Sequence, residues 1–186
     1  GLTASRNAGA RLANGSWLAF LDDDDSVDPD WLVRLVDEVG ANSGIVFCGH
    51  QRWTTDGRHL GSLLPASMGA VLLDKEVSVL PATWIMRRDV FDAAGGYLDG
   101  LPFMHQFELL IRAVRSCVGL GLDTAAVSEP LLRYTVREHS ERPMQWPQLG
   151  LDGGRWILAR HAAAFESDRS ARANYEAIVG VAAVRC

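Results

Sequence analysis

The chain lacks several features that would place it in a specialised class. Its three cysteines, Cys48, Cys117 and Cys186, are widely separated and form no CxxC pair. This spacing excludes a disulfide framework and a zinc knuckle and favours reduced thiols in a cytosolic setting. No apolar run has the length of a transmembrane helix, and no signal peptide is recognised. These absences predict a cytoplasmic protein, with a peripheral position at the inner membrane face as the alternative.

Basic residues are not concentrated in any block of the sequence. The formal net charge is −5, which gives no overall attraction to nucleic acid or anionic lipid. Nucleic-acid binding is therefore disfavoured.

A glycine-rich phosphate loop is also missing, because Gly95-Gly96 and Gly153-Gly154 fit neither the Walker nor the dinucleotide-binding pattern. This absence weighs against a nucleotidyl- or phosphoryl-transferring enzyme.

Apolar material, in contrast, is sufficient for a buried core. Of the 186 residues, 48% are hydrophobic and 22% are charged, which is typical of a globular chain. No internal repeat or low-complexity linker divides it. We predict a main domain over residues 1–142 and a C-terminal helical extension over residues 143–186.

Apolar periodicity and turn signals predict alternating helices and strands. The segment 16–21 is apolar almost throughout, which suits a strand covered on both faces, as in a parallel α/β sheet. The predicted fold class is α/β, with a Rossmann-type, mostly parallel sheet flanked by helices and with further helices at the C-terminal end. Helices are expected at residues 5–12, 29–39, 89–94, 107–114, 156–165 and 171–184, and strands at 16–21, 44–53, 83–87, 125–127 and 131–136.

Four consecutive carboxylates, Asp22 to Asp25, follow the strand expected at 16–21. Adjacent anions repel and raise each other's pKa values, a cost that a bound divalent cation removes. If strand geometry persists, Asp22 and Asp24 lie on one face and Asp23 and Asp25 on the other, so a D-x-D pair can share one hard cation. Open α/β sheets also bind ligands at the carboxyl ends of their strands. We therefore predict a metal–diphosphate site here.

A simpler interpretation of the acidic run is that it solvates a loop. It would then favour the positive end of the next helix, which is expected to begin near Asp28 with Pro29 at its first position. A calcium-binding EF-hand is excluded by spacing, because Val27 and Val33 occupy the positions that require glycine and a bidentate glutamate.

Several short motifs occur in a fixed order along the chain. They are Arg6-Asn7-x-Gly9, Ala13-x-Gly15, Phe20-Leu21-Asp22-Asp23-Asp24-Asp25, Pro29-x-Trp31-Leu32, Phe91 through Gly95-Gly96-Tyr97, Glu108-Leu109-x-x-Arg112, and Arg137-x-His139 near Tyr134. A lone D-x-D would be weak evidence, but the combined spacing is specific. As far as about residue 140, the chain resembles the family 2 glycosyltransferases of the GT-A fold, and its fold is expected to be a partial GT-A domain.

The resemblance implies a metal-dependent, inverting transfer of a sugar from a nucleotide-sugar, often a UDP-sugar, to a hydroxyl group of a glycan, lipid or small molecule. Asp22 and Asp24 would hold Mn2+ or Mg2+ against the donor diphosphate, with Asp25 as a neighbouring ligand or sugar contact and Asp23 beside them. His139 lies where some members place a further metal or diphosphate contact, although a surface role is equally expected of a lone histidine. The Arg6-Asn7 pair would position its helix beside the diphosphate strand.

Two departures from the family pattern bear on activity. The opening strand of the family, and the acidic residue that contacts uracil and ribose, are expected upstream of Gly1. Without them, the strand at 16–21 is expected to expose an apolar edge. Either an upstream segment exists or the chain is a fragment.

The second departure concerns the catalytic base. Family members usually have Glu-Asp where this chain has His105-Gln106, and the Asp removes a proton from the acceptor hydroxyl. Gln106 has no basic site at neutral pH, so it cannot take that proton. His105 is the nearest replacement because its pKa suits base catalysis near neutrality, and Glu108, one helical turn away, is the alternative. A weak or inactive enzyme is the third possibility.

Two other functions stay open from the residues alone. A degenerate glycosyltransferase-like domain would bind its ligands or act as a scaffold without turnover, and a nucleotidyl- or phosphoryl-transferring enzyme would use the acidic cluster for two metals. Three tryptophans, Trp84, Trp146 and Trp156, are candidates for stacking on a sugar ring, although tryptophans more often lie in cores. Trp84 is the strongest of these candidates, because it lies on the strand that precedes the helix expected on the acceptor side.

Overall fold

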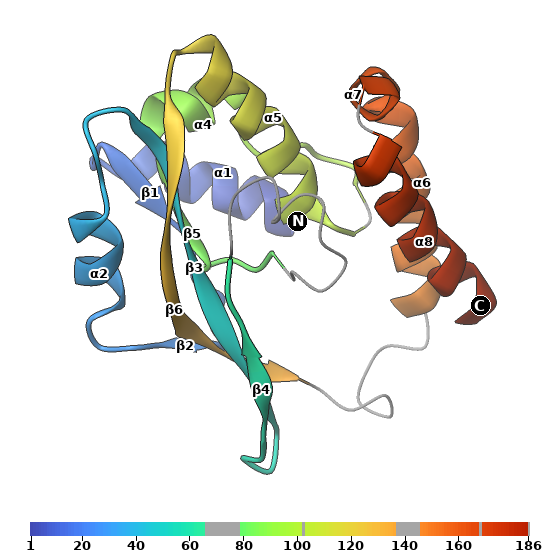
Figure 1. The fold of residues 1–186 in the computed structure, drawn as a ribbon, viewed down its shortest axis with the longest axis horizontal. Coiled ribbons are helices and arrows are strands. Elements are labelled where there is room, and N and C mark those ends of the chain that lie inside the picture. Colours follow the sequence, from blue (N-terminus) through green and yellow to red (C-terminus); the bar gives the residue numbers. More distant parts are fainter. Residues whose placement is uncertain (66–78, 102, 137–145, 168, 186) are drawn as a thin grey trace.

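A mixed sheet with helices on both sides forms the centre of the protein (Figure 1). The computed structural model describes residues 1–65, 79–101, 103–136, 146–167 and 169–185. The strands are β1 (Trp17–Ala19), β2 (Ser26–Val27), β3 (Ser43–Thr54), β4 (His59–Leu63), β5 (Trp84–Arg87) and β6 (Asp123–Val136). The helices are α1 (Leu2–Leu12), α2 (Trp31–Asp37), α4 (Arg88–Ala94), α5 (His105–Gly119), α6 (Trp146–Arg160), α7 (Ala162–Ser167) and α8 (Arg169–Arg185). The predicted α/β class is confirmed.

The sheet is not mostly parallel, and that part of the expectation is corrected. Its strand order is β1-β5-β3-β6-β2, with β4 paired to β3 outside this path. Only β3 and β6 pair in parallel among the described strands. The reason is that β5 lies between β1 and β3 and runs antiparallel to both. The apolar pattern of a strand reports its burial and not the direction of its neighbours, so this insertion could not be predicted.

Strand β1 is shorter and more exposed than expected. Leu18 is buried, but Ala19 and the following Leu21 are exposed, so the strand is not covered on both faces. Among the described strands, β1 pairs with β5 alone and lies at the edge of the sheet. One edge of β1 is therefore unpaired within the part of the chain that the structure describes.

Strand β6 joins the two short strands expected at 125–127 and 131–136. Its parallel register with β3 shifts between Cys48 and Gly49, where Val127 and Pro130 are the respective partners. Proline has no N–H to donate to a ladder, and an irregularity of this kind accommodates it inside a long strand. The two predicted strands are therefore the halves of one strand.

Alternate residues of β3 supply two cores on opposite faces of the sheet. Ile45 and Phe47 pack with α4 and α5, whereas Val46 and Cys48 pack on the side of α2. This alternation is the two-residue period of a strand. Each such buried side chain contributes about 2 kcal/mol of hydrophobic stabilisation. Cys48 and Cys117 are free and buried, and Cys186 lies outside the described residues.

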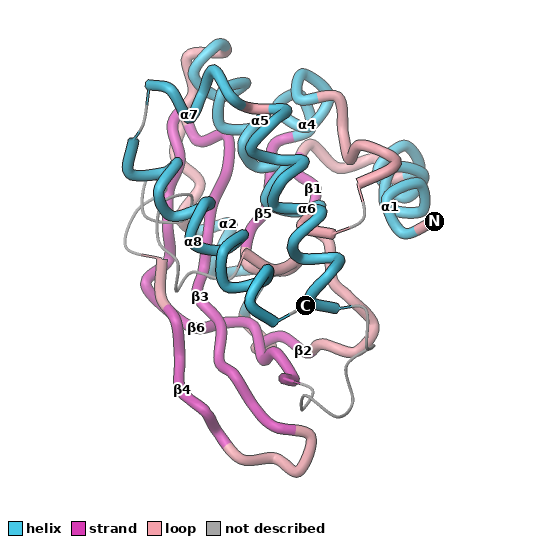
Figure 2. The backbone as a smooth tube through the Cα atoms, turned by 90° about the vertical axis from the view of Figure 1, so that its right-hand side faces the viewer, coloured by secondary structure: helices cyan, strands magenta, loops and turns pink. Residues whose placement is uncertain are grey.

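Helix α5 forms a middle layer between the sheet and helices α6 to α8 (Figures 1 and 2). Its residues Leu109, Leu110 and Ala113 belong to the core under the sheet. Ile111, together with Met104 directly before the helix, belongs to a third cluster formed with the C-terminal helices. The predicted domain boundary at residue 142 falls in 137–145, outside the described residues, and stays a prediction. No helix in the described ranges has both the length and the apolarity needed to cross a membrane.

His50 on β3 is a buried histidine with an unsatisfied nitrogen. His50 is 2% exposed, and its Nε2 has no hydrogen-bond partner within the described residues. Burial, assisted by the charge of Arg52, lowers the pKa of His50 from 6.5 to about 4. The folded protein therefore holds this imidazole neutral, and protonation opposes folding.

Acid is expected to destabilise the protein through His50. Between pH 6.5 and pH 4 the unfolded chain binds a proton that the folded chain does not, so stability falls as the pH is lowered through this window. The contribution approaches about 3 kcal/mol at pH 4. Urea unfolding at pH 7 and pH 4 will show a smaller acid loss for His50→Leu than for the unsubstituted protein. The exposed His59 on β4 provides the control, and an equal effect of His59→Leu would contradict the assignment.

Candidate functional site

The four carboxylates form a turn rather than a continuation of the strand. β1 ends at Ala19, and the amide N–H of Asp25 donates to the carbonyl of Asp22 at 3.2 Å. The expected alternation of Asp22 and Asp24 with Asp23 and Asp25 on opposite faces is therefore corrected. A turn instead keeps all four carboxylates on one short loop.

The charges in this turn act on one another. The pKa of Asp25 rises from 3.8 to about 6, first because the carboxyl is partly buried and then because Asp24 and Asp22 repel its negative charge. The backbone of Thr135, near the end of β6, acts in the opposite direction and limits this rise in the pKa of Asp25. The turn thus lies beside the end of β6. His139 lies outside the described residues, and its predicted metal contact stays a prediction.

Arg6 on α1 makes an ion pair with Asp22. The side chain of Arg6 is only 7% exposed, and its guanidinium lies over the ring of Tyr97, 5.4 Å from the centroid. Two polar atoms beside this pair, Nη1 of Arg6 and the hydroxyl of Tyr97, are buried and have no hydrogen-bond partner within the described residues. Buried polar atoms are normally paired, so this place can receive additional polar groups.

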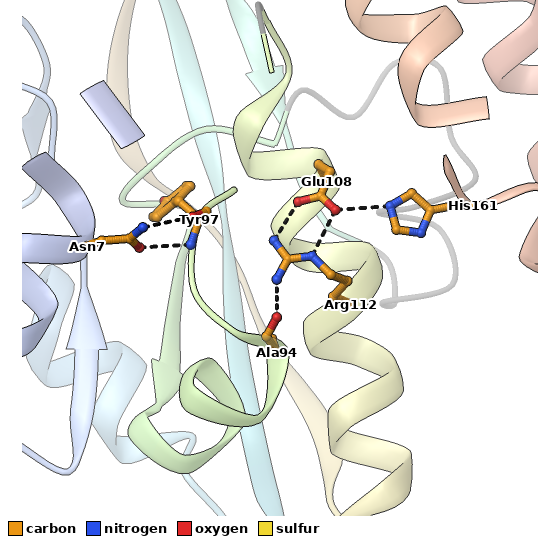
Figure 3. A network of polar contacts seen from close by, with 6 residues as sticks. All are labelled: Asn7, Ala94, Tyr97, Glu108, Arg112 and His161. Atoms are coloured by element: carbon orange, nitrogen blue, oxygen red, sulfur yellow. Dashed lines mark hydrogen bonds and ion pairs between the residues drawn. The ribbon is translucent and has the colours of Figure 1, made fainter. Parts of the chain in front are cut away.

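Asn7 fixes α1 to the loop that carries Tyr97. Its Nδ2 donates to the carbonyl of Tyr97 at 2.8 Å, and the amide of Tyr97 donates to its Oδ1 at 2.9 Å (Figure 3). Gly96, at φ +66°, permits this approach, because a Cβ there would lie 2.8 Å from Oδ1 of Asn7. Thr3 adds a hydrogen bond to Asp99 at 2.7 Å. These contacts join α1 to the loop after α4 through Asn7, and the positioning of the helix beside the diphosphate strand stays a prediction.

His105 is the first residue of α5 and lies on the Arg6 side of the site. Its Nε2 donates to the carbonyl of Leu101 at 2.8 Å, which leaves Nδ1 as the nitrogen that can accept a proton. Partial burial lowers the pKa of His105, the bond to Leu101 opposes this, and the positive charge of Arg6 lowers the pKa further. A lowered pKa keeps the imidazole neutral near pH 7, which is the form required of a base.

Glu108, the alternative base, is placed differently. It is 1% exposed, and its oxygens accept hydrogen bonds from Arg112 and from His161. Burial acts to raise the pKa of Glu108, but the bonds from Arg112 and His161 outweigh it and hold the pKa below its ordinary value. A carboxylate that is buried and engaged on both oxygens has no position from which to meet an acceptor hydroxyl.

Trp84 is a core residue and not an exposed platform for a sugar ring. It is 0% exposed and packs against Phe20, with ring centroids 5.6 Å apart. Phe20 precedes the acidic turn by one residue and also contacts Tyr97 edge-on at 5.3 Å. Phe20 thus joins the residues before the acidic turn to the core through Trp84 and Tyr97. Trp156 packs on the third cluster, and the side chain of Trp146 is not described.

The residues fit a divalent cation that is completed by a phosphate. Within the described ranges, no three His, Cys, Asp or Glu side chains converge into a preformed metal cage. Mg2+ is, however, usually held by one or two carboxylates together with substrate phosphates and water, rather than by a protein cage. Repulsion from Asp24 and Asp22 helps to raise the pKa of Asp25. A cation bound among these carboxylates would offset that repulsion.

Comparison with known proteins now gives the family. Residues 1–95 match the family described as "Glycosyl transferase family 2", which is just over half of the 186 residues. The chain belongs to this family of glycosyltransferases, and the match covers α1, the acidic turn and the Gly95 end of α4.

The curated relatives of the chain are also named as glycosyltransferases. An "Uncharacterized glycosyltransferase" of Haemophilus influenzae is 26% identical over 149 residues, which is 76% of this chain and 49% of the relative. Shorter matches join the chain to two Bacillus subtilis proteins. "Putative glycosyltransferase EpsH" is 36% identical over 27% of this chain and 14% of the relative, and "Uncharacterized glycosyltransferase EpsJ" is 37% identical over 31% and 17%. The chain spans about half the length of the Haemophilus relative and less of the other two.

The tether between α1 and the Tyr97 loop generates a stability prediction. Asn7→Ala removes both hydrogen bonds to the Tyr97 backbone and leaves its polar groups without those partners, so we expect a loss of about 2 kcal/mol in unfolding free energy. Urea denaturation measures this loss. Ser5→Ala, at an exposed position on the same helix, should change stability by less than about 0.5 kcal/mol. Equal effects of the two substitutions would show that the tether contributes little.

Proposed function

We propose that this chain carries out metal-dependent, inverting transfer of a sugar from a nucleotide-sugar to a hydroxyl acceptor. The observation that carries the proposal is the acidic turn in a family 2 glycosyltransferase chain, in which Arg6 makes an ion pair with Asp22. The donor is a UDP-sugar or another nucleoside diphosphate sugar, and the acceptor is a glycan, lipid or small molecule. The reaction takes place in the cytoplasm or at the inner membrane face.

Asp22 and Asp24 hold Mn2+ or Mg2+ in this proposal, and Asp25 and Asp23 complete the acidic turn beside them. The cation supplies neutralisation of the negative charge that develops on the departing nucleoside diphosphate. Arg6 has two tasks: its bond to Asp22 orients that carboxylate, and its unpartnered Nη1 donates to a diphosphate oxygen. Asn7 holds α1 in place, and His139 is a further contact to the cation or diphosphate.

His105 takes the proton from the acceptor hydroxyl in this proposal. Its lowered pKa and its position near Arg6 support the role, whereas the engaged carboxylate of Glu108 argues against that alternative. As the acceptor oxygen attacks the anomeric carbon, Nδ1 of His105 receives the proton and the diphosphate departs on the opposite face. The bond between Nε2 and Leu101 keeps the ring in the tautomer that this step requires.

Metal binding provides the first test of the proposal. Asp24→Asn is expected to weaken Mn2+ binding in the presence of UDP by about tenfold or more, because one ligating charge is removed. Isothermal titration calorimetry of the full chain measures the affinity. Asp37→Asn on α2 is the matched control, since Asp37 is exposed and outside the turn. Equal Mn2+ affinities for all three proteins would overturn the metal assignment, and binding without turnover of any nucleotide-sugar in a panel would identify a binding or scaffold domain instead.

The base assignment has its own test. We expect His105→Gln to lower kcat by about 10²-fold or more, which is the usual contribution of a general base. The KM for the donor and the Mn2+ affinity should stay within about threefold, because His105 does not bind the cation. The unsubstituted enzyme should lose activity in acid with an apparent pKa below 6.5, because the pKa of His105 is lowered, and the variant should lack this limb. Unchanged kcat in His105→Gln would remove His105 from the mechanism.

A further inference from the structure

The face of α5 that packs on the C-terminal helices is mostly apolar but includes the buried carboxylate of Glu108. Met104 and Ile111 pack there with Ile157 of α6, and Phe165 and Tyr175 complete the cluster. Glu108 lies on the same helical face, because residues at spacings of three, four and seven share one side of a helix. The carboxylate is therefore enclosed between α5 and the C-terminal helices, where a lone charge would be strongly unfavourable.

Three nitrogen atoms from two residues, Arg112 and His161, donate hydrogen bonds to this buried carboxylate (Figure 3). Arg112, one turn along α5, donates from Nε to Oε1 at 2.8 Å and from Nη2 to Oε2. Nε2 of His161 donates to Oε1 at 3.0 Å. His161 is 5% exposed and stands between the last residue of α6 and the first residue of α7. A single side chain thus joins the junction of two C-terminal helices to α5.

The network continues from Arg112 towards the donor side of the site. The remaining guanidinium nitrogen, Nη1, donates to the carbonyl of Ala94 (Figure 3). Ala94 ends α4 and is followed by Gly95 and Gly96, both with positive φ. The next residue is Tyr97, whose backbone holds Asn7. The polar contacts thereby connect His161 to the helix that carries Arg6.

Helix α6 also packs against the segment directly before His105. Gly153 lies so close to Phe103 that a Cβ would be 3.0 Å from the Phe103 carbonyl oxygen. Met104, between Phe103 and His105, has φ +65°, a conformation that is unfavourable for a residue other than glycine and needs support from its surroundings. The C-terminal helices therefore contact the chain on both sides of His105: before it at Phe103 and, one turn after it, at Glu108.

We propose that His161 is a positioning residue, which fixes the first turn of α5 and with it the ring of His105 by holding the buried Glu108 carboxylate to the α6–α7 junction. The role of His105 in this statement rests on the proposed function, whereas the docking of the helices does not. Apolar packing alone can tolerate small rotations of one helix on another. A hydrogen bond to a carboxylate that Arg112 already holds in a bidentate arrangement fixes the rotation of α5, because the bond depends on direction.

The experiment compares three substitutions at His161 in the full chain. His161→Phe keeps a ring but removes the donor, so hydrogen exchange of amides in α6 to α8 and in the first turn of α5 should accelerate by about tenfold or more relative to β3. The ring signals of His105 in NMR spectra should shift, which is practical because the chain has five histidines. His161→Gln supplies an amide donor and should retain most of the protection and the His105 signals. His161→Asn, which is shorter, replaces His161→Phe if that variant does not fold.

Activity supplies a second readout that depends on the proposed function. His161→Phe should lower kcat by about tenfold to hundredfold, as expected for a displaced catalytic group, with the donor KM and the Mn2+ affinity almost unchanged. The matched control is Arg160→Gln, which alters the exposed neighbour of His161 and should change none of these quantities. If the unsubstituted chain has no transferase activity, the proposed function fails, while the exchange and NMR measurements still decide the positioning role.

Two outcomes would overturn the inference. Faster exchange of α6 to α8 in His161→Phe with unchanged exchange and ring signals at His105 would show that the contact docks the helices without positioning the residue. Equal effects of His161→Phe and His161→Gln would show that the hydrogen bond to Glu108 is not what matters.

Discussion

The buried guanidinium of Arg6 is the constraint from which the arrangement of the site follows. Arginine stays protonated in proteins, so its charge requires an anion wherever it is buried. Asp22 is that anion, and the ion pair joins the acidic turn after β1 to α1. The residues between α1 and β1 are exposed. The Tyr97 ring covers the same guanidinium. The guanidinium of Arg6 on α1 thus contacts both the acidic turn and the loop after α4.

The part of the chain after α4 depends on a second buried charge of opposite sign. Glu108 is surrounded by apolar side chains and is satisfied from two directions, by Arg112 on its own helix and by His161 from the C-terminal helices. Hydrogen bonds and the backbone from Ala94 to Tyr97 connect the two charged centres.

Local patterns in the sequence predicted much of this arrangement and missed its long-range parts. The acidic run after an apolar strand, the Asn7 motif and the helix with Glu108 and Arg112 were visible because each lies within a few residues. The turn at Asp22 to Asp25 was missed, because strand periodicity says nothing about where a strand stops. The burial of Trp84 and the partner of Glu108 were also missed: His161 is 53 residues away, and only packing of the C-terminal helices brings it near.

The positive φ of Met104 has a consequence for how this site can vary. The left-handed conformation disfavours β-branched side chains strongly and costs glycine and asparagine least. The carbonyl of Phe103, one residue before Met104, lies so close to Gly153 of α6 that a larger side chain at position 153 would not fit without a shift. Substitutions before His105 are therefore coupled to substitutions in α6, and the two segments are expected to diversify together rather than separately.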